Sequence, residues 1–131
     1  MLIPFPGRIA NGRYSFDGQP FQLECNDKEG PNAIHGFVRH LSWQVREALT
    51  NKVTCEVRLD AETYAARGYP FSLDIAVTYE LDAQGLSCAF VVKNIGDRAA
   101  PVGIGFHPYF TVGTSLIDET EAQLPGSGYL E

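Results

Sequence analysis

Apolar and polar residues alternate along much of the middle of this chain, with the two-residue period of a β-strand that has one buried face. The alternation is clear in residues 52–60 and 71–81, and it resumes in residues 86–92 after the turn-forming segment 83–85. Residues 71–92 are therefore predicted to form an antiparallel hairpin with one apolar face, beside a further strand at residues 52–60. The apolar positions are Val53, Cys55, Val57, Leu59, Phe71, Leu73, Ile75, Val77, Tyr79, Leu81, Leu86, Cys88, Phe90 and Val92.

Turn chemistry predicts a second hairpin near the N-terminus. The pair Asp17-Gly18 separates residues 13–16 from residues 19–23, and Asp-Gly supplies the positive φ angles of a tight primed turn. Residues 94–97 are predicted to turn the chain into another strand at residues 101–107. A helical pattern is confined to residues 61–67, and the chain carries no repeat, low-complexity tract or linker. The sequence thus predicts an all-β fold, with residues 1–131 as one unit that has no internal boundary.

The composition and the net charge of the chain exclude some classes of binding partner. The 131 residues are 44% hydrophobic, which is ordinary for one soluble domain. The net charge of −6 argues against nucleic acid or an anionic membrane as a partner, because both require a basic face. We expect a cytoplasmic location, since the chain opens with no signal-like segment and holds no run long enough to cross a bilayer.

The cysteines and histidines do not have the spacing of a metal site. Cys25, Cys55 and Cys88 are odd in number and form no CxxC pair, so neither a disulfide framework nor a zinc site is indicated. We expect Cys55 and Cys88 to be buried thiols in a reducing compartment. Three scattered histidines without a paired carboxylate give no further reason to expect a metal.

His107 is the first candidate for chemistry. It lies in a run of glycine and aromatic residues, 103–110, and imidazole transfers protons near neutral pH. Gly103 and Gly105 permit close approach of a ligand or of another backbone segment, and Pro108 ends strand pairing. The alternative is a buried histidine that hydrogen-bonds a backbone carbonyl. The aromatic neighbours, which offer an apolar surface to a sugar ring, favour the functional interpretation.

His35 and Asn32 form a second polar cluster, in a loop that follows Gly30-Pro31. Gly36 lets the backbone bend beside the His35 imidazole. The Asn32 amide has donors and acceptors suited to sugar hydroxyls, but an Asx turn explains it equally well. His40, five residues beyond His35, is interpreted as a surface residue.

Two arginines complete the set of candidates. Arg8 lies in a segment rich in proline and glycine, where a solvated charge is the ordinary outcome and hydrogen bonding to ligand hydroxyls is the alternative. Arg39 is predicted to be exposed and lies near His35 in the sequence, where it can meet an anionic group. Trp43 is assigned to core packing.

Three segments in this order resemble the aldose 1-epimerase (galactose mutarotase) family. They are Gly7-Arg8-Ile9-Ala10-Asn11-Gly12, then Asn32-Ala33-Ile34-His35-Gly36, then the segment that ends His107-Pro108-Tyr109-Phe110. The resemblance implies a large antiparallel β-sandwich and the interconversion of the α and β anomers of an aldose. It assigns His107 as the general acid at the ring oxygen, and it assigns Arg8 and His35 to sugar binding. It implies a monosaccharide partner and no cofactor.

The chain departs from the family in two ways. Gly7 stands where the family often has asparagine. Family members are also about twice as long, and their catalytic base is a glutamate near the far end. Glu119, Glu121 and Glu131 lie in no matching motif, so none of them is assigned as the base. The chain resembles the N-terminal half of such a protein, and we expect it to have little activity alone.

Two other functions stay open. A hexose-phosphate epimerase is the first, with a sugar phosphate as substrate and Arg39 against the phosphate. A non-catalytic carbohydrate-binding module is the second. In each case an incomplete sandwich leaves strand edges unpaired, and it leaves apolar residues such as Phe71, Leu73, Ile75 and Val77 uncovered. We therefore expect a homo-oligomer or association with a missing C-terminal half.

Overall fold

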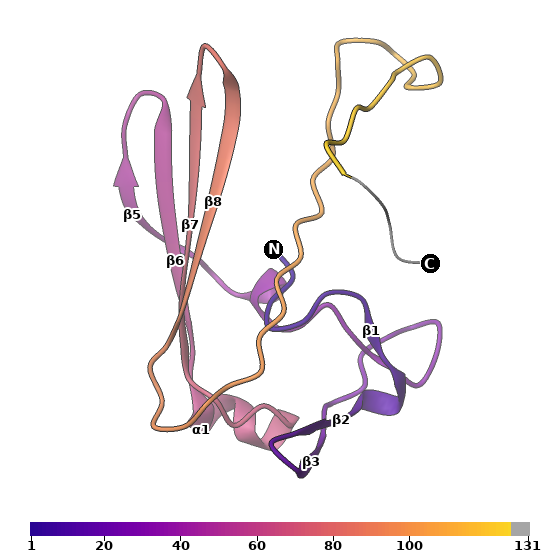
Figure 1. Ribbon diagram of the computed structural model, residues 1–131, viewed down its shortest axis with the longest axis vertical. Helices are drawn as coiled ribbons and strands as arrows, with labels where there is room; N and C mark the ends of the chain where they lie inside the picture. Colours follow the sequence, from indigo (N-terminus) through magenta and orange to yellow (C-terminus); the bar gives the residue numbers. More distant parts are fainter. Residues whose placement is uncertain (127–131) are drawn as a thin grey trace.

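A four-stranded antiparallel sheet dominates the structure, a computed structural model that describes residues 1–126 (Figure 1). Two short two-stranded ribbons, 3-10 turns and one short helix pack at one end of this sheet. The expected all-β, antiparallel class is confirmed. The strands are β1 (Arg8–Ile9), β2 (Arg13–Phe16), β3 (Gln19–Gln22), β4 (Ala33–Ile34), β5 (Gln44–Ala48), β6 (Lys52–Leu59), β7 (Leu73–Asp82) and β8 (Gly85–Asn94); the helices are α1 (Ala61–Tyr64) and the 3-10 turns η1 (Ala10–Gly12), η2 (Val38–His40) and η3 (Ala65–Arg67).

The large sheet has the strand order β5-β6-β7-β8, and each strand pairs with its neighbour in the sequence. The predicted hairpin of residues 71–92 is confirmed as β7 and β8, with Val77 opposite Phe90. Leu59 lies opposite Leu73 in the β6–β7 pair, so the alternating apolar positions share one face of the sheet.

The local turn predictions are also confirmed. Asp17 and Gly18, with φ values of 50° and 72°, join β2 to β3 as a primed turn requires. Helix α1 and η3 occupy residues 61–67, the segment with the helical pattern. The Asp60 carboxylate caps α1 by accepting a hydrogen bond from the Glu62 N–H at 3.2 Å. None of the helices in residues 1–126 is long and apolar enough to cross a membrane.

The prediction of a strand at residues 101–107 is wrong. The segment forms a single isolated bridge, between Gly105 and Leu2. It faces the N-terminal residues, where Pro4 and Pro6 have no N–H to donate, so a continuous ladder cannot form there.

The core lies at one end of the large sheet, against the end of the apolar face where Leu59 meets Leu73. Aromatic rings fill this region, and the Phe37 and Tyr64 rings pack with their centroids 4.8 Å apart. The Tyr69 and Phe71 rings are 5.0 Å apart. The buried residues of this cluster are Ile3, Leu23, Ala33, Phe37, Val38, Leu59, Tyr64, Tyr69, Phe71, Leu73 and Ile75, and Trp43 packs against them as expected.

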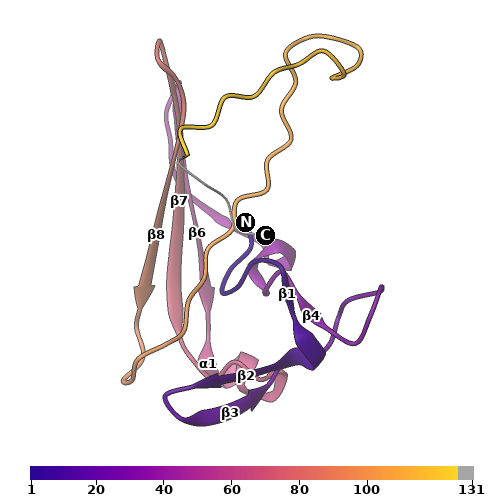
Figure 2. The same cartoon turned by 45° about the vertical axis from the view of Figure 1, so that its right-hand side comes forward.

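The expectation that Phe71, Leu73, Ile75 and Val77 are uncovered is wrong, because all four are buried. The N-terminal ribbons and the aromatic cluster cover this end of the sheet. The far end projects away from the N-terminal ribbons and α1 (Figure 2), and there Leu81 and Leu86 are 59% and 51% exposed.

Cys55 and Cys88 also differ from expectation. Both lie on the apolar face, yet they are half-buried rather than buried. Each pairs with the stretch of β7 between Val77 and Tyr79, on the side toward the projecting end, where less of the chain covers the sheet.

Leu73→Ala and Leu81→Ala form a matched pair of substitutions on one face of β7. Leu73 is fully buried, so its truncation is expected to lower the free energy of unfolding by about 2–5 kcal/mol. Leu81→Ala is expected to cost less than about 1 kcal/mol, since most of that side chain is already in water. Urea unfolding followed by circular dichroism measures both, and equal losses would contradict a core confined to the Leu73 end.

Candidate functional site

Residues 2–7 lie between the two histidine-bearing segments and hydrogen-bond both of them. On one side, Leu2 and Gly105 exchange two backbone hydrogen bonds of 2.9 Å. On the other side, the Phe37 N–H donates to the Ile3 carbonyl at 2.9 Å. The three segments are therefore adjacent in space although they are distant in sequence, and residues 2–7 set the spacing between the His35 loop and the His107 segment.

The glycines beside each histidine are needed for this close approach. A Cβ atom on Gly36 would lie 2.2 Å from the Ile3 carbonyl oxygen, and φ at Gly36 is +62°. A Cβ atom on Gly105 would lie 2.6 Å from the Pro6 Cβ. The sequence indicated that Gly105 admits a ligand or another backbone segment and that Gly36 lets the chain bend, and in the structure the neighbour of both is the N-terminal segment.

His35 is held by Gly7 through two hydrogen bonds. Its backbone N–H donates to the Gly7 carbonyl at 3.0 Å, and its Nδ1 accepts from the Gly7 N–H at 3.1 Å. Since Nδ1 is the acceptor, the proton of the neutral imidazole sits on Nε2. His35 has φ of +64°, a conformation that turns the chain back beside β1. The neutral ring thus presents one N–H donor.

Arg8 is fixed by two carboxylates from the loop between β3 and β4. Its Nε donates to Asp27 Oδ2 at 2.7 Å, and its Nη2 donates to Glu29 Oε2 at 2.6 Å. Arg8 also pairs with Ile34 in the β1–β4 ribbon, which places the guanidinium near the His35 loop. About half of the Arg8 side chain remains exposed.

Sequence reasoning missed Asp27, whose side chain is only 4% exposed. Hydrogen bonds from the Glu29 backbone N–H, from Asn32 and from Arg8 lower the pKa of this carboxyl to about 2. One feature of the sequence could have indicated Asp27. It lies in a cluster with Asn26 and Gly30-Pro31, which is typical of a turn whose side chains hydrogen-bond the backbone.

Asn32 serves the same loop. Its Nδ2 donates to Asp27 Oδ2 at 3.1 Å, and its Oδ1 accepts from the Asn11 N–H at 3.3 Å. The amide therefore ties the loop to η1, as in the turn interpretation of this residue. One N–H and one lone pair of the amide stay available for a ligand.

Arg39 and His40 lie on η2, and both side chains are exposed, as expected for His40. Within residues 1–126, Arg39 makes no ion pair or side-chain hydrogen bond. Its charge nevertheless acts on His35.

His107 is exposed, and its ring lies 5.2 Å from that of Tyr109. The preceding Phe106 packs on Tyr79 and Phe90 of the large sheet, with ring centroids 6.4 and 5.5 Å away.

The pKa of His35 lies below its ordinary value. Partial burial is the main cause, and the positive charges of Arg39, Arg8 and His107 follow in that order, while Asp27 opposes them. Arg8, Arg39 and His107 thus all act on His35, and we call these four residues the His35 cluster. The structure places Arg8 and His35 on adjacent segments, and it engages Asn32 in the loop whose Asp27 holds Arg8.

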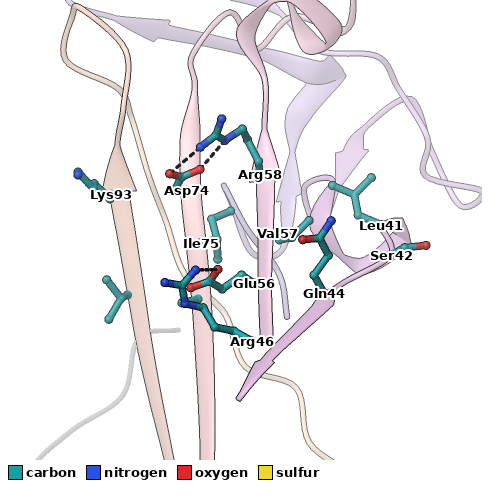
Figure 3. Close-up of a pocket in the computed structure, with 12 residues that line it drawn as sticks. Leu41, Ser42, Gln44, Arg46, Glu56, Val57, Arg58, Asp74, Ile75 and Lys93 are labelled. Carbon is teal, nitrogen blue, oxygen red and sulfur yellow. Dashed lines mark hydrogen bonds and ion pairs between the residues drawn. The ribbon is translucent and has the colours of Figure 1, made fainter. Parts of the chain in front are cut away.

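A separate hollow of about 750 Å³ lies on the polar face of the large sheet (Figure 3). Arg58 makes a two-pronged ion pair with Asp74 there, at 2.6 and 3.0 Å, and Arg46 bonds Glu56 at 3.3 Å. None of the five candidate residues lines this hollow. Its lining is Leu41, Ser42, Gln44, Arg46, Glu56, Val57, Arg58, Asp74, Ile75, Ala76, Val91 and Lys93.

Comparison with curated proteins identifies relatives of this chain. It is 43% identical to the uncharacterized protein YihR of Escherichia coli K12, over 97% of this chain and 40% of YihR. It is 30% identical to the galactose mutarotase of Sus scrofa, over 94% of this chain and 35% of that protein. The chain therefore spans well under half the length of these relatives.

Solved structures of related proteins have the same fold as this chain. A galactose mutarotase related enzyme from Lactobacillus acidophilus matches 76% of this chain, with a TM-score of 0.59 and 27% identity, over 29% of its own length. A galactose mutarotase-like protein from Clostridium acetobutylicum matches 69% of this chain, with a TM-score of 0.58 and 24% identity, over 28% of its length. The galactose mutarotase-like fold is thereby confirmed. The family model for aldose 1-epimerase matches residues 1–131, and the chain belongs to the aldose 1-epimerase family.

Proposed function

We propose that this chain supplies the sugar-binding and proton-donating side of an aldose 1-epimerase site. One observation carries the proposal: residues 2–7 hydrogen-bond both histidine-bearing segments, and they hold the Arg8, His35 and His107 segments next to one another. A cluster of N–H donors on one surface suits the hydroxyl and ring oxygens of an aldose. Family membership supplies the reaction class.

In the proposed reaction a base removes the proton of the anomeric hydroxyl, and His107 gives a proton to the ring oxygen. The bond from C1 to the ring oxygen breaks and C1 becomes an aldehyde carbon. Rotation about C1–C2 exposes the other face of the carbonyl, and the reverse proton transfers close the ring. Only protons move, so the reaction needs no cofactor.

His35 and Arg8 take binding roles in this scheme. The lowered pKa of His35 keeps its ring neutral, with Nε2–H as a donor to a sugar hydroxyl. Arg8 has N–H groups beyond those that bond Asp27 and Glu29, and they are directed to other hydroxyls. His107, which is not hydrogen-bonded within residues 1–126, is the group left to exchange protons.

No residue of this chain is proposed as the base. Glu119 and Glu121 are exposed in the C-terminal segment beyond the last strand, and Glu131 lies outside the described residues. The chain covers 35–40% of the relatives' length, so the base belongs to the remaining part of the family domain in this proposal.

The isolated chain is expected to equilibrate α-galactose no faster than buffer alone. An acid without its base loses the contribution of that base, which is typically about 10²–10⁴-fold. Polarimetry on freshly dissolved sugar measures the rate, with the Sus scrofa galactose mutarotase as the positive control. A fast rate that persists in His107→Asn would contradict the assignment of His107.

Joining this chain to the C-terminal part of the Sus scrofa enzyme provides the complementary assay. The joined protein is expected to gain a measurable rate, and His107→Asn is expected to lower that rate by roughly 10²–10⁴-fold. His40→Asn is the matched control, since His40 is exposed and lies outside the cluster. Equal effects of the two substitutions would contradict the proposed acid.

A sugar phosphate is the second candidate substrate. The observation that favours it is Arg39, a guanidinium beside His35 that has no ion pair within residues 1–126. Arginine binds phosphate through two parallel hydrogen bonds, and a free guanidinium on the rim of a sugar site fits that role.

Arg39→Ala separates these two candidates. It is expected to raise the pKa of His35, because it removes a nearby positive charge, and to weaken galactose 6-phosphate binding roughly tenfold while leaving galactose binding unchanged. NMR titration measures both effects. Arg46→Ala, on the polar face of the sheet, is the control and should change neither. A sugar affinity that is unchanged for both ligands would exclude the phosphate role.

We also propose that the projecting end of the large sheet associates with another polypeptide, either a second copy or the rest of the family domain. The support is the exposure of Leu81 and Leu86 and the outer edges of β5 and β8, which pair with no other strand within residues 1–126. Sedimentation velocity of the purified chain is expected to show dimers or larger species. A soluble monomer at all concentrations would contradict association between copies.

A further inference from the structure

Asp27 is an acidic side chain in a loop, yet almost all of it is buried. Its Oδ2 accepts from Arg8 Nε at 2.7 Å and from Asn32 Nδ2 at 3.1 Å. Its Oδ1 accepts from the Glu29 N–H at 3.1 Å. Both oxygens are thus committed to donors that belong to the protein, and only 4% of the side chain is exposed to solvent.

An ionised carboxylate suits this arrangement best. Three donors converge on Asp27, and an amide would replace one of the two acceptor oxygens by a nitrogen that only donates, whereas a protonated acid would lose the negative charge and one acceptor position. The pKa of Asp27, lowered to about 2 by these same bonds, agrees with a carboxylate that stays charged across the physiological range.

The bond to Nε fixes more of Arg8 than the bond to Glu29 does. Nε lies at the root of the planar guanidinium, so a buried acceptor there sets the plane and the direction of the whole group. The Glu29 side chain is 80% exposed, and water screens its ion pair with Nη2. Asp27 therefore holds the orientation in which Nη1 of Arg8 is turned away from both carboxylates.

We propose that Asp27 is the positioning residue of the sugar site, and that it orients Arg8 and Asn32 for a sugar hydroxyl without touching the sugar itself. This inference rests on the proposed sugar-binding role of Arg8. Asp27 bonds Arg8 of β1 and Asn32 directly, and Asn32 in turn accepts a hydrogen bond from Asn11 of η1. The effect of Asp27 therefore reaches both the first and the second motif segment.

Asp27→Asn and Glu29→Gln form the matched pair that tests it. Each removes one carboxylate from Arg8, but only the first removes the negative charge and one acceptor oxygen from the side chain that is 4% exposed. In Asp27→Asn the Arg8 Nε–H signal in an ¹H–¹⁵N spectrum is expected to shift strongly, and galactose affinity is expected to fall roughly tenfold or more. In Glu29→Gln both are expected to stay close to those of the unchanged chain. Equal behaviour of the two variants would overturn the proposal.

A double-mutant cycle with Arg8→Ala distinguishes positioning from a general structural role. If Asp27 acts through Arg8, then Asp27→Asn lowers galactose affinity much less in the Arg8→Ala background than alone. Equal additional losses in both backgrounds would overturn the proposal. Should Asp27→Asn fail to fold, Asp27→Glu keeps the charge but displaces it by one methylene, and the same Nε–H shift and loss of affinity are expected.

The Arg8 signal also separates this inference from the proposed function. A strong Nε–H shift specific to Asp27→Asn, in a chain that binds no galactose, would support the orientation of Arg8 and contradict the sugar site. Galactose binding that is the same in Asp27→Asn and in the unchanged chain would overturn the positioning role and leave the sugar site standing.

Discussion

The close contact between the backbone of residues 2–7 and the two histidine-bearing segments is the constraint on which the site depends. Gly36 and Gly105 make it possible, because a Cβ atom at either position would collide with the N-terminal segment. Ile3, at the centre of this segment, is fully buried in the core. The packing of the core and the spacing of the two histidines are thus set by the same few residues.

Electrostatics follows from that geometry. The charges of Arg39, Arg8 and His107 act on His35, and Asp27, whose side chain is 4% exposed, opposes them. Partial burial and the neighbouring positive charges lower the pKa of His35, which favours the neutral ring with Nε2–H as a hydrogen-bond donor.

The sequence predicted the elements with strong local signals. Alternation located β6, β7 and β8, and Asp17-Gly18 located the β2–β3 turn, because strand pleat and turn dihedrals act on neighbouring residues. The prediction of a strand at residues 101–107 was wrong for a non-local reason. The fold places this segment beside the N-terminal residues, where Pro4 and Pro6 cannot donate backbone hydrogen bonds. The burial of Phe71 and Val77 likewise depends on distant segments that cover them.

The candidate site shows the same contrast between residues that local motifs indicate and residues that only tertiary packing brings in. The motif segments named Arg8, His35 and His107, but nothing in the sequence indicated which carboxylate would meet Arg8. Asp27 lies 19 residues away from Arg8, and the contact arises from the pairing of β1 with β4. Supporting residues of this kind are set by tertiary packing, so the local pattern indicates candidate binding residues more readily than the residues that hold them in place.

The most direct test of the central claim is a titration of isotope-labelled chain with galactose, followed by the NMR signals of the imidazole and guanidinium groups. The account predicts that His35, His107 and Arg8 shift together with one dissociation constant, while His40 and the residues of the polar hollow, such as Arg46 and Lys93, stay in place. Shifts confined to the polar hollow, or separate dissociation constants for His35 and His107, would contradict a single site held by residues 2–7.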